Sequence, residues 1–229
     1  MSRKGPVMNW IHYLPALLKG AEITAIIGVT STLLGAALAF AAGIARAEGG
    51  RLLSWTVLVY IEIFRGTSLL VQLFWLFYAL PLIGISFDPM ATGIAGLALN
   101  IGAYGAEVVR GALEAVPLQQ REAARALNFG WAHTLFRIYM PQAVVEMMPS
   151  LGNLAVQNLK DTSLVSLITI SDLTFRAQSL RNMRPADSAP IYGLTLLGYF
   201  AMALVFSACM RKLERLLRRG SAFPRSTHE

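Results

Sequence analysis

Three ionisable residues interrupt segments of the chain that are otherwise apolar: Glu107, Lys160 and Asp161. A charged side chain is expensive inside a membrane, so such residues usually face water, a partner charge or a transported solute. Glu107 could pair with Lys160 and form a structural ion pair. Alternatively, Asp161, Thr162 or Ser163 could cap a new helical segment whose free N–H groups face a substrate carboxylate. The sequence leaves both roles open.

Four amide side chains lie in the same apolar surroundings: Gln72, Asn100, Asn153 and Gln157. An amide both donates and accepts hydrogen bonds, so each could bind a zwitterion or tie two helices together. The second role is the more common one for any single residue. Together with Glu107, Lys160, Asp161, Thr162 and Ser163, these amides are our candidates for a substrate pathway.

Other chemistries find little support in the residue types. Cys209 is the single cysteine and lies in an apolar run, which argues against a disulfide or a zinc site. The three histidines show no metal-ligand spacing. No G-x-x-x-x-G-K-S/T stretch occurs, so this chain is not expected to bind a nucleotide phosphate in that way. We therefore predict no catalytic residues, no metal and no cofactor.

The composition favours a membrane protein. Hydrophobic residues make up 55% of the 229 residues and charged residues only 14%, while the formal net charge is +7. A basic chain could bind nucleic acid, but here the basic residues gather at the ends of apolar runs and form no aromatic-basic surface. Positive flanks of membrane spans explain the charge better.

A bilayer core about 30 Å thick requires roughly 20 apolar residues in a helix. Five segments are expected to span it, and they cover residues 13–45, 66–87, 89–110, 145–171 and 188–210. Residues 46–65 have less apolar content and are expected to form an interfacial or elbow helix. The first segment is less well explained as a cleaved signal peptide, because the apolar run of this segment is too long. The third segment contains four glycines that would bring helix backbones close together: Gly93, Gly96, Gly102 and Gly105.

Five spans place the termini on opposite sides, and the distribution of Lys and Arg predicts the orientation. With the C-terminus inside, the inner segments hold thirteen basic residues: Arg46, Arg51, Arg65, Arg110, Arg121, Arg125, Arg137, Arg211, Lys212, Arg215, Arg218, Arg219 and Arg225. The outer segments hold six: Arg3, Lys4, Lys19, Arg176, Arg181 and Arg184. We therefore expect a periplasmic N-terminus and a cytoplasmic C-terminus.

The long polar connection at residues 114–141 would then face the cytoplasm. Pro117 suits the first turn of a helix, and residues 122–127 are strong helix formers. Asn128 and Gly130 are typical helix stops. A second helix follows, and its own apolar side lies before Pro141. This pattern predicts a helix, a corner and a second helix.

Several motifs resemble those of bacterial ABC importer permeases of the polar amino acid family. Glu122, Ala123 and Ala124, followed by Gly130, Ile138 and Pro141, are similar to the EAA loop of that family. The other similar stretches are residues 62–72 (EIFRGTSLLVQ), 104–111 (YGAEVVRG), 116–121 (VPLQQR) and 158–164 (NLKDTSL). With residues 116–121 counted as the approach to the EAA loop, these are four motifs in order, which are far more specific than one.

The resemblance implies an all-α integral membrane protein with five transmembrane helices and the type I ABC importer permease fold, as one domain over residues 1–229. It also implies that the EAA-like loop docks into a groove on an ATPase subunit. Glu122 and Arg125 would carry charged contacts there, while Ala123, Ala124 and Gly130 permit close approach.

The implied partners are two ATP-binding subunits, a second permease subunit that is identical or similar, and a periplasmic or lipoprotein substrate-binding protein. Arg176, Arg181 and Arg184 could contact that binding protein or belong to a solvated loop. The implied cargo is a polar amino acid or a related zwitterion such as ectoine. Two other classes stay open: an ATP-independent secondary transporter and a membrane-bound enzyme.

Overall fold

The structure is a computed structural model that describes residues 10–220 and the side chains of residues 12–218. Every regular element in this range is a helix. Some residues used above for the charge count or for metal-ligand spacing lie outside the described part: Arg3, Lys4, Arg225, His228 and the side chain of Arg219.

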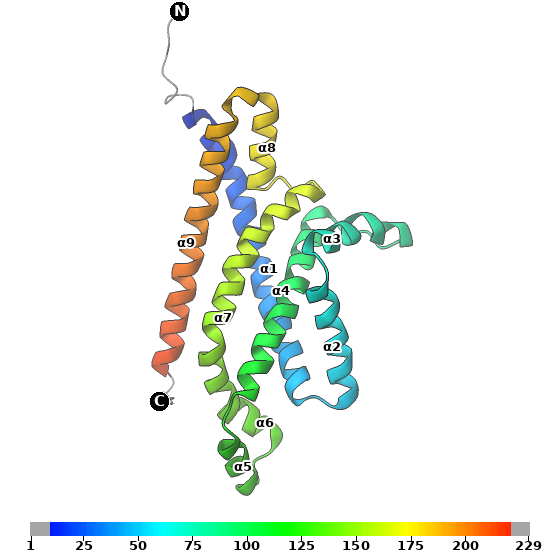
Figure 1. Ribbon diagram of the computed structural model, residues 1–229, viewed down its shortest axis with the longest axis vertical. Helices are drawn as coiled ribbons and strands as arrows, with labels where there is room; N and C mark the ends of the chain where they lie inside the picture. The colour runs from blue at the N-terminus through cyan, green and yellow to red at the C-terminus, as the bar shows by residue number, and fades with distance from the viewer. Residues whose placement is uncertain (1–9, 221–229) are drawn as a thin grey trace, which may run out of the picture.

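Two long helices form the centre of the bundle (Figure 1). α1 (Leu14–Glu48) packs against α4 (Pro89–Glu114) along much of its length. A Cβ atom on Gly105 would lie only 2.6 Å from Ala39 Cβ, and one on Gly102 only 2.9 Å from Leu38 Cβ. The close approach expected from the glycines of α4 is therefore confirmed, and it depends on the missing side chains.

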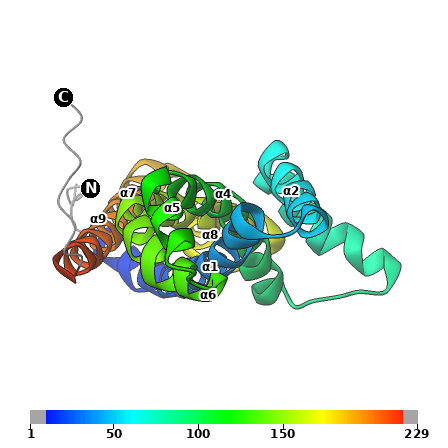
Figure 2. The same ribbon diagram turned by 90° about the horizontal axis from the view of Figure 1, so that it is seen from below.

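The segment after α1 contains one helix, a sharp bend and three shorter helices. α2 (Arg51–Gly66) is followed by α3 (Leu69–Phe74), a π-helix (Trp75–Ala79) and a 3-10 helix (Leu80–Ile83), and the chain bends by 105° between Gly66 and Leu69. Thr67 and Ser68 are extended, which breaks the helix. The run 66–87, predicted as one span, is therefore not one continuous helix, and it reaches the length and hydropathy of a span only together with α2. Figure 2 shows the segment after α2 projecting from the edge of the bundle opposite α9.

The polar connection folds at one end of the bundle (Figure 1). α5 (Leu118–Ala126) ends in a turn in which Asn128 has a φ of 55°, so the predicted helix and stop are confirmed. α6 (Trp131–His133) then continues through a π-helix (Thr134–Tyr139) into α7 (Met140–Asp161). The helix does not end before Pro141, because the wider π turn accommodates a residue that lacks an N–H group.

The remainder of the chain returns through the bundle. α7 passes into a 3-10 helix (Thr162–Ile168), and α8 (Leu173–Met183) lies at the end of the bundle opposite α5. A short 3-10 turn (Pro185–Asp187) leads into α9 (Ser188–Gly220). α1 begins near α8, whereas α9 runs toward the end that carries α5 (Figure 1).

Among the described residues, three helical stretches are long and apolar enough to cross a membrane: α1, α4 and Pro185–Arg218. The bent pair of α2 and the helices after Ser68 would make a fourth. α7 is not in this set, because Gln157, Lys160, Asp161 and other polar residues lower its hydropathy.

Candidate functional site

A cavity of about 410 Å³ opens where the bend after α2 meets α4 and the end of α7. Its lining combines hydroxyl, amide and carboxylate groups with apolar side chains. The residues are Thr67, Ser68, Leu69, Asn100, Ile101, Tyr104, Leu154, Gln157, Asn158, Asp161 and Leu164. Three predicted pathway residues, Asn100, Gln157 and Asp161, are thus brought to one site from two helices.

Asp161 contributes the single acidic group of this lining, and no Lys or Arg side chain joins it there. Gln157 Nε2 donates a hydrogen bond to Asp161 Oδ1 at 2.9 Å. Since Gln157 is one turn before Asp161 on α7, the helix itself orients the carboxylate. The cavity therefore presents a negative charge beside neutral donors and acceptors.

Gln72 stabilises the bend that forms one wall. Its Nε2 donates to Phe64 O at 2.8 Å and to Thr67 Oγ1 at 2.8 Å. Its Oε1 accepts a hydrogen bond from Asn100 Nδ2 at 3.1 Å. Gln72 therefore satisfies a carbonyl at the end of α2 and ties the bend to α4, so it acts as a link between helices.

Asn158 was not singled out among the candidates, although it opens one of the quoted motifs. Its side chain is buried, and Nδ2 donates to Ser31 Oγ at 2.7 Å and to Thr32 Oγ1 at 2.9 Å on α1. The signal that could have identified Asn158 is its position one turn before Asp161 on the same helix.

The proposed pair of Glu107 and Lys160 is wrong. Glu107 binds Arg110 on its own helix, with Oε2 at 2.9 Å from Nη2, and Arg110 also binds Glu114 at 2.6 Å. Lys160 is exposed and does not line the cavity. Asn153 lies elsewhere, in a crevice between α7 and α9.

The expected capped break near Asp161 is also absent from the described chain. Asp161 makes no capping hydrogen bond, and Thr162 Oγ1 instead donates back to Leu159 O at 2.7 Å. Thr162 and Ser163 begin a 3-10 helix that continues α7 directly, so no new helix start faces the cavity. The break comes later, at Thr169, whose φ is 68°.

A second polar cluster joins α8 to its neighbours. Asp172 caps α8 by accepting hydrogen bonds from Phe175 N at 2.8 Å and Thr174 N at 3.2 Å, and Tyr199 Oη donates to it at 3.1 Å. Burial raises the pKa of Asp172 to about 6, although these hydrogen bonds act in the opposite direction.

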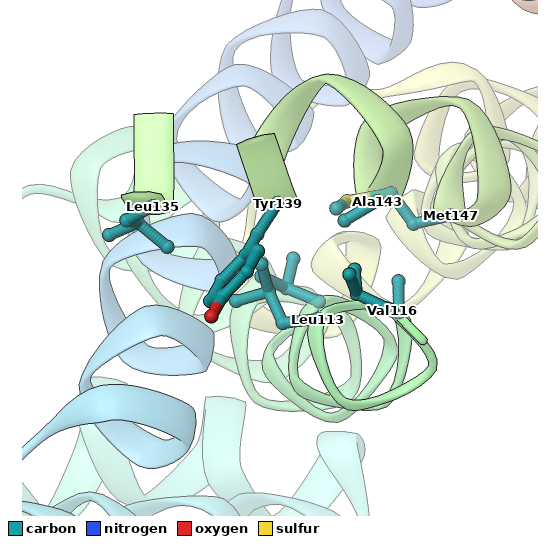
Figure 3. Close-up of a cluster of buried hydrophobic side chains, with 8 residues drawn as sticks. Leu113, Val116, Leu135, Tyr139, Ala143 and Met147 are labelled. Atoms are coloured by element: carbon teal, nitrogen blue, oxygen red, sulfur yellow. The ribbon is translucent and has the colours of Figure 1, made fainter. Parts of the chain in front are cut away.

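The EAA-like loop is firmly attached at its base. Figure 3 shows Leu113 of α4 and Val116, just after α4, packed against residues that follow the turn: Leu135, Tyr139, Ala143 and Met147. Arg121 lies over the Tyr139 ring at 5.0 Å, and Gln142 Nε2 donates to Gln120 Oε1 at 2.6 Å. Movement of α5 would therefore be transmitted to the start of α7.

The outer side of this loop is open. Glu122, Ala123, Arg125 and Gly130 are exposed, but Ala124 is only 2% exposed and faces the protein. Ala124 therefore does not offer a contact to a partner, contrary to expectation. Large apolar side chains are exposed beside these residues: Leu118, Leu127, Phe129, Trp131 and Phe136. An exposed apolar patch with charges at its edge is typical of a protein interface.

Known proteins resemble the chain over nearly its whole length. It is 50% identical over 218 residues to the probable amino-acid ABC transporter permease protein y4tF of Sinorhizobium fredii, covering 93% of this chain and 91% of that protein. It is 34% identical over 209 residues to the glutamine transport system permease protein GlnP of Escherichia coli, covering 90% and 94%.

A crystal structure of an amino acid ABC transporter with histidines superposes with a TM-score of 0.83 at 29% identity, covering 94% of this chain and 99% of that one. The inward-facing MetNI methionine ABC transporter shares the fold, with a TM-score of 0.74 at 16% identity, covering 89% and 97%. Residues 32–219 match the family model described as binding-protein-dependent transport system inner membrane component. The chain belongs to this family of inner-membrane components and is a multi-pass inner-membrane protein.

Proposed function

We propose that this chain is the permease subunit of an ATP-driven importer of polar amino acids or amino-acid-derived zwitterions. The observation that carries the proposal is one helical path from Trp131 to Asp161, which joins the EAA-like loop to the cavity. These residues cover about 45 Å at the rise of an α-helix, enough to cross a membrane. A displacement of the loop would therefore move the wall of the cavity.

The cavity chemistry supports a zwitterionic substrate. The carboxylate of Asp161 would bind an ammonium or other cationic group, because charge-assisted hydrogen bonds are the stronger kind. The second N–H of the Gln157 amide would donate to the substrate carboxylate, while both N–H groups of Asn100 are already bound to Phe64 O and Gln72 Oε1. Ectoine-like solutes carry the same two charges, so the proposed class includes them together with polar amino acids.

The exposed side of α5 and α6 would dock onto an ATP-binding subunit, with Glu122, Ala123, Arg125 and Gly130 at the contact. Two such subunits, a second permease subunit and a substrate-binding protein would complete the assembly. Five crossings are proposed, with α2 and the helices after it as one bent crossing and α7 with its 3-10 extension as another. The N-terminus would be periplasmic, and alternating access would follow from loop movement.

Uptake into proteoliposomes tests this function. The complete assembly should accumulate a labelled amino acid only with ATP, the ATP-binding subunits and the binding protein all present. Omitting the ATP-binding subunits should abolish uptake. Uptake that persists without them would indicate a secondary transporter, and conversion of the substrate without transport would indicate an enzyme.

A further inference from the structure

A separate crevice lies between α7 and α9, away from the cavity that contains Asp161. It has a volume of about 160 Å³ and mixes polar with apolar groups; its lining is Met148, Pro149, Gly152, Asn153, Val156, Ser207, Met210, Arg211 and Glu214. The proposed transport cycle gives this crevice no role. Its amide, hydroxyl and guanidinium groups together form a set of hydrogen-bond donors suited to a phosphate.

The position of the crevice along α9 places it at the inner surface of the membrane. From Ser188 to Met210, α9 has 23 residues without a charged side chain, which is about 34 Å of helix. This length exceeds the bilayer core of about 30 Å. Arg211 therefore lies at the level of the inner headgroups in the proposed orientation.

The side of α9 above the crevice is apolar and uncovered. Leu197, Phe200 and Leu204 are each at least half exposed, and the successive intervals from Leu197 through Phe200 and Leu204 to Arg211 are three, four and seven residues. This spacing puts all four on one side of the helix. α9 also lies at the edge of the bundle opposite the projecting segment after α2 (Figure 2). An acyl chain along these apolar residues would bring its headgroup to Arg211.

The charges near the crevice favour an anionic headgroup. Glu214 is already bound to Arg218 at 2.9 Å. Within the described residues, the Arg211 guanidinium makes no hydrogen bond or ion pair, and Arg215 adds positive charge one turn later. A basic segment that follows a membrane span directly on its cytoplasmic side attracts anionic lipid.

We propose that the crevice between α7 and α9 binds one anionic phospholipid of the inner leaflet. Arg211, with Asn153 and Ser207, would hold the phosphate, and the acyl chain would lie along Leu197, Phe200 and Leu204. The site has a defined position, unlike the diffuse attraction that every basic tail exerts on a negative membrane.

Native mass spectrometry of the full-length chain, purified in detergent, tests the site. Phosphatidylglycerol should remain bound and phosphatidylcholine should not. Arg211→Gln should lower phosphatidylglycerol occupancy about fivefold, the effect of one basic residue near such a surface. Lys212→Gln removes the same charge from the far side of α9 and should change occupancy less than twofold. Equal losses in the two variants would overturn the proposal.

Two further arms separate a lipid site from a purely electrostatic attraction and from a site for a free anion. Asn153→Leu keeps every charge but removes the amide, and it should weaken phosphatidylglycerol binding about threefold. Unchanged occupancy in both Arg211→Gln and Asn153→Leu would refute the site. Inorganic phosphate added at the lipid concentration should displace no lipid. Displacement by phosphate would instead assign the crevice to a free anion and reject the lipid.

Discussion

Gln157 and Asp161 lie one helical turn apart on α7, and the amide of the first donates to the carboxylate of the second at 2.9 Å. The pair lies in the wall of the cavity, at one end of the helical path that continues to the EAA-like loop. The site and the proposed ATPase contact are therefore two ends of the same element.

Asp161→Asn should impair uptake because it removes the single acidic group of the lining while keeping the shape of the side chain. A hydrogen bond to a charged group contributes about 1.5–3 kcal/mol, so the apparent KM for uptake should rise about tenfold or more. Glu146→Gln is the control, since Glu146 is exposed on the same helix and does not line the cavity. An unchanged KM in Asp161→Asn would remove Asp161 from the site.

Glu122→Lys should uncouple ATP hydrolysis from uptake while insertion into the membrane stays normal. Glu122 is exposed on α5, and reversal of its charge would oppose a complementary contact on the ATP-binding subunit. ATPase activity and uptake are measured on the same proteoliposomes. Gln119→Lys adds positive charge to the same helix without removing Glu122, so it should transport more than Glu122→Lys. If Glu122→Lys still couples ATP hydrolysis fully to uptake, Glu122 makes no such contact with the ATP-binding subunit.

The two alanines of the EAA motif should respond differently to the same substitution. Ala124 is 2% exposed, so Ala124→Leu should overpack the base of the loop and destabilise the protein by about 1–3 kcal/mol. Ala123 is exposed, so Ala123→Leu should change stability by less than about 0.5 kcal/mol. Thermal unfolding of the purified variants measures both. Equal losses would show that α5 is rotated about its axis, with Ala123 and Ala124 equally close to the protein.

This contrast shows what sequence patterns could and could not predict. Helix formers and stop residues predicted α5 and its end correctly, because those signals are local. The orientation of α5 depends on contacts outside the helix, because Arg121 lies over the Tyr139 ring and donates to Leu113 O. The charge pairing failed for the opposite reason: two isolated charges suggested a distant pair, whereas the partner of Glu107 is Arg110, only three residues away.

The sequence also could not predict the bend after Gly66 or which residues line the cavity. An uncharged run from 66 to 87 has the length of a span, and nothing local says that Thr67 and Ser68 become extended. The bend is stabilised by Gln72 through Phe64 and Asn100, which is a tertiary contact. Asn100, Gln157 and Asp161 could be named as polar residues in apolar surroundings, but only the packing brings them together.

Asp172 should make stability depend on pH. Its pKa in the folded protein is raised to about 6 from an ordinary value of 3.8, so the folded state holds a proton that the unfolded state releases. The resulting stabilisation is fully present below about pH 4 and is lost as pH rises through 6, on the order of 3 kcal/mol. Thermal unfolding between pH 4 and 7 should show this decline, and Asp172→Asn should flatten it. If Asp172→Asn shows the same decline of stability with pH, Asp172 is not the origin of the decline.

Thr169 should store strain that glycine would release. Its φ of 68° lies in the left-handed region, where a β-branched side chain is unfavourable, and the side chain is exposed. Such strain amounts to about 1–3 kcal/mol, although the flexibility of glycine in the unfolded chain offsets part of the gain. Thr169→Gly should therefore raise the apparent Tm of the purified protein. Asn128→Gly is the matched control, because Asn128 has a φ of 55° but asparagine tolerates this region, so its Tm should rise less. A larger rise in Asn128→Gly than in Thr169→Gly would mean that the turn after the 3-10 helix is unstrained.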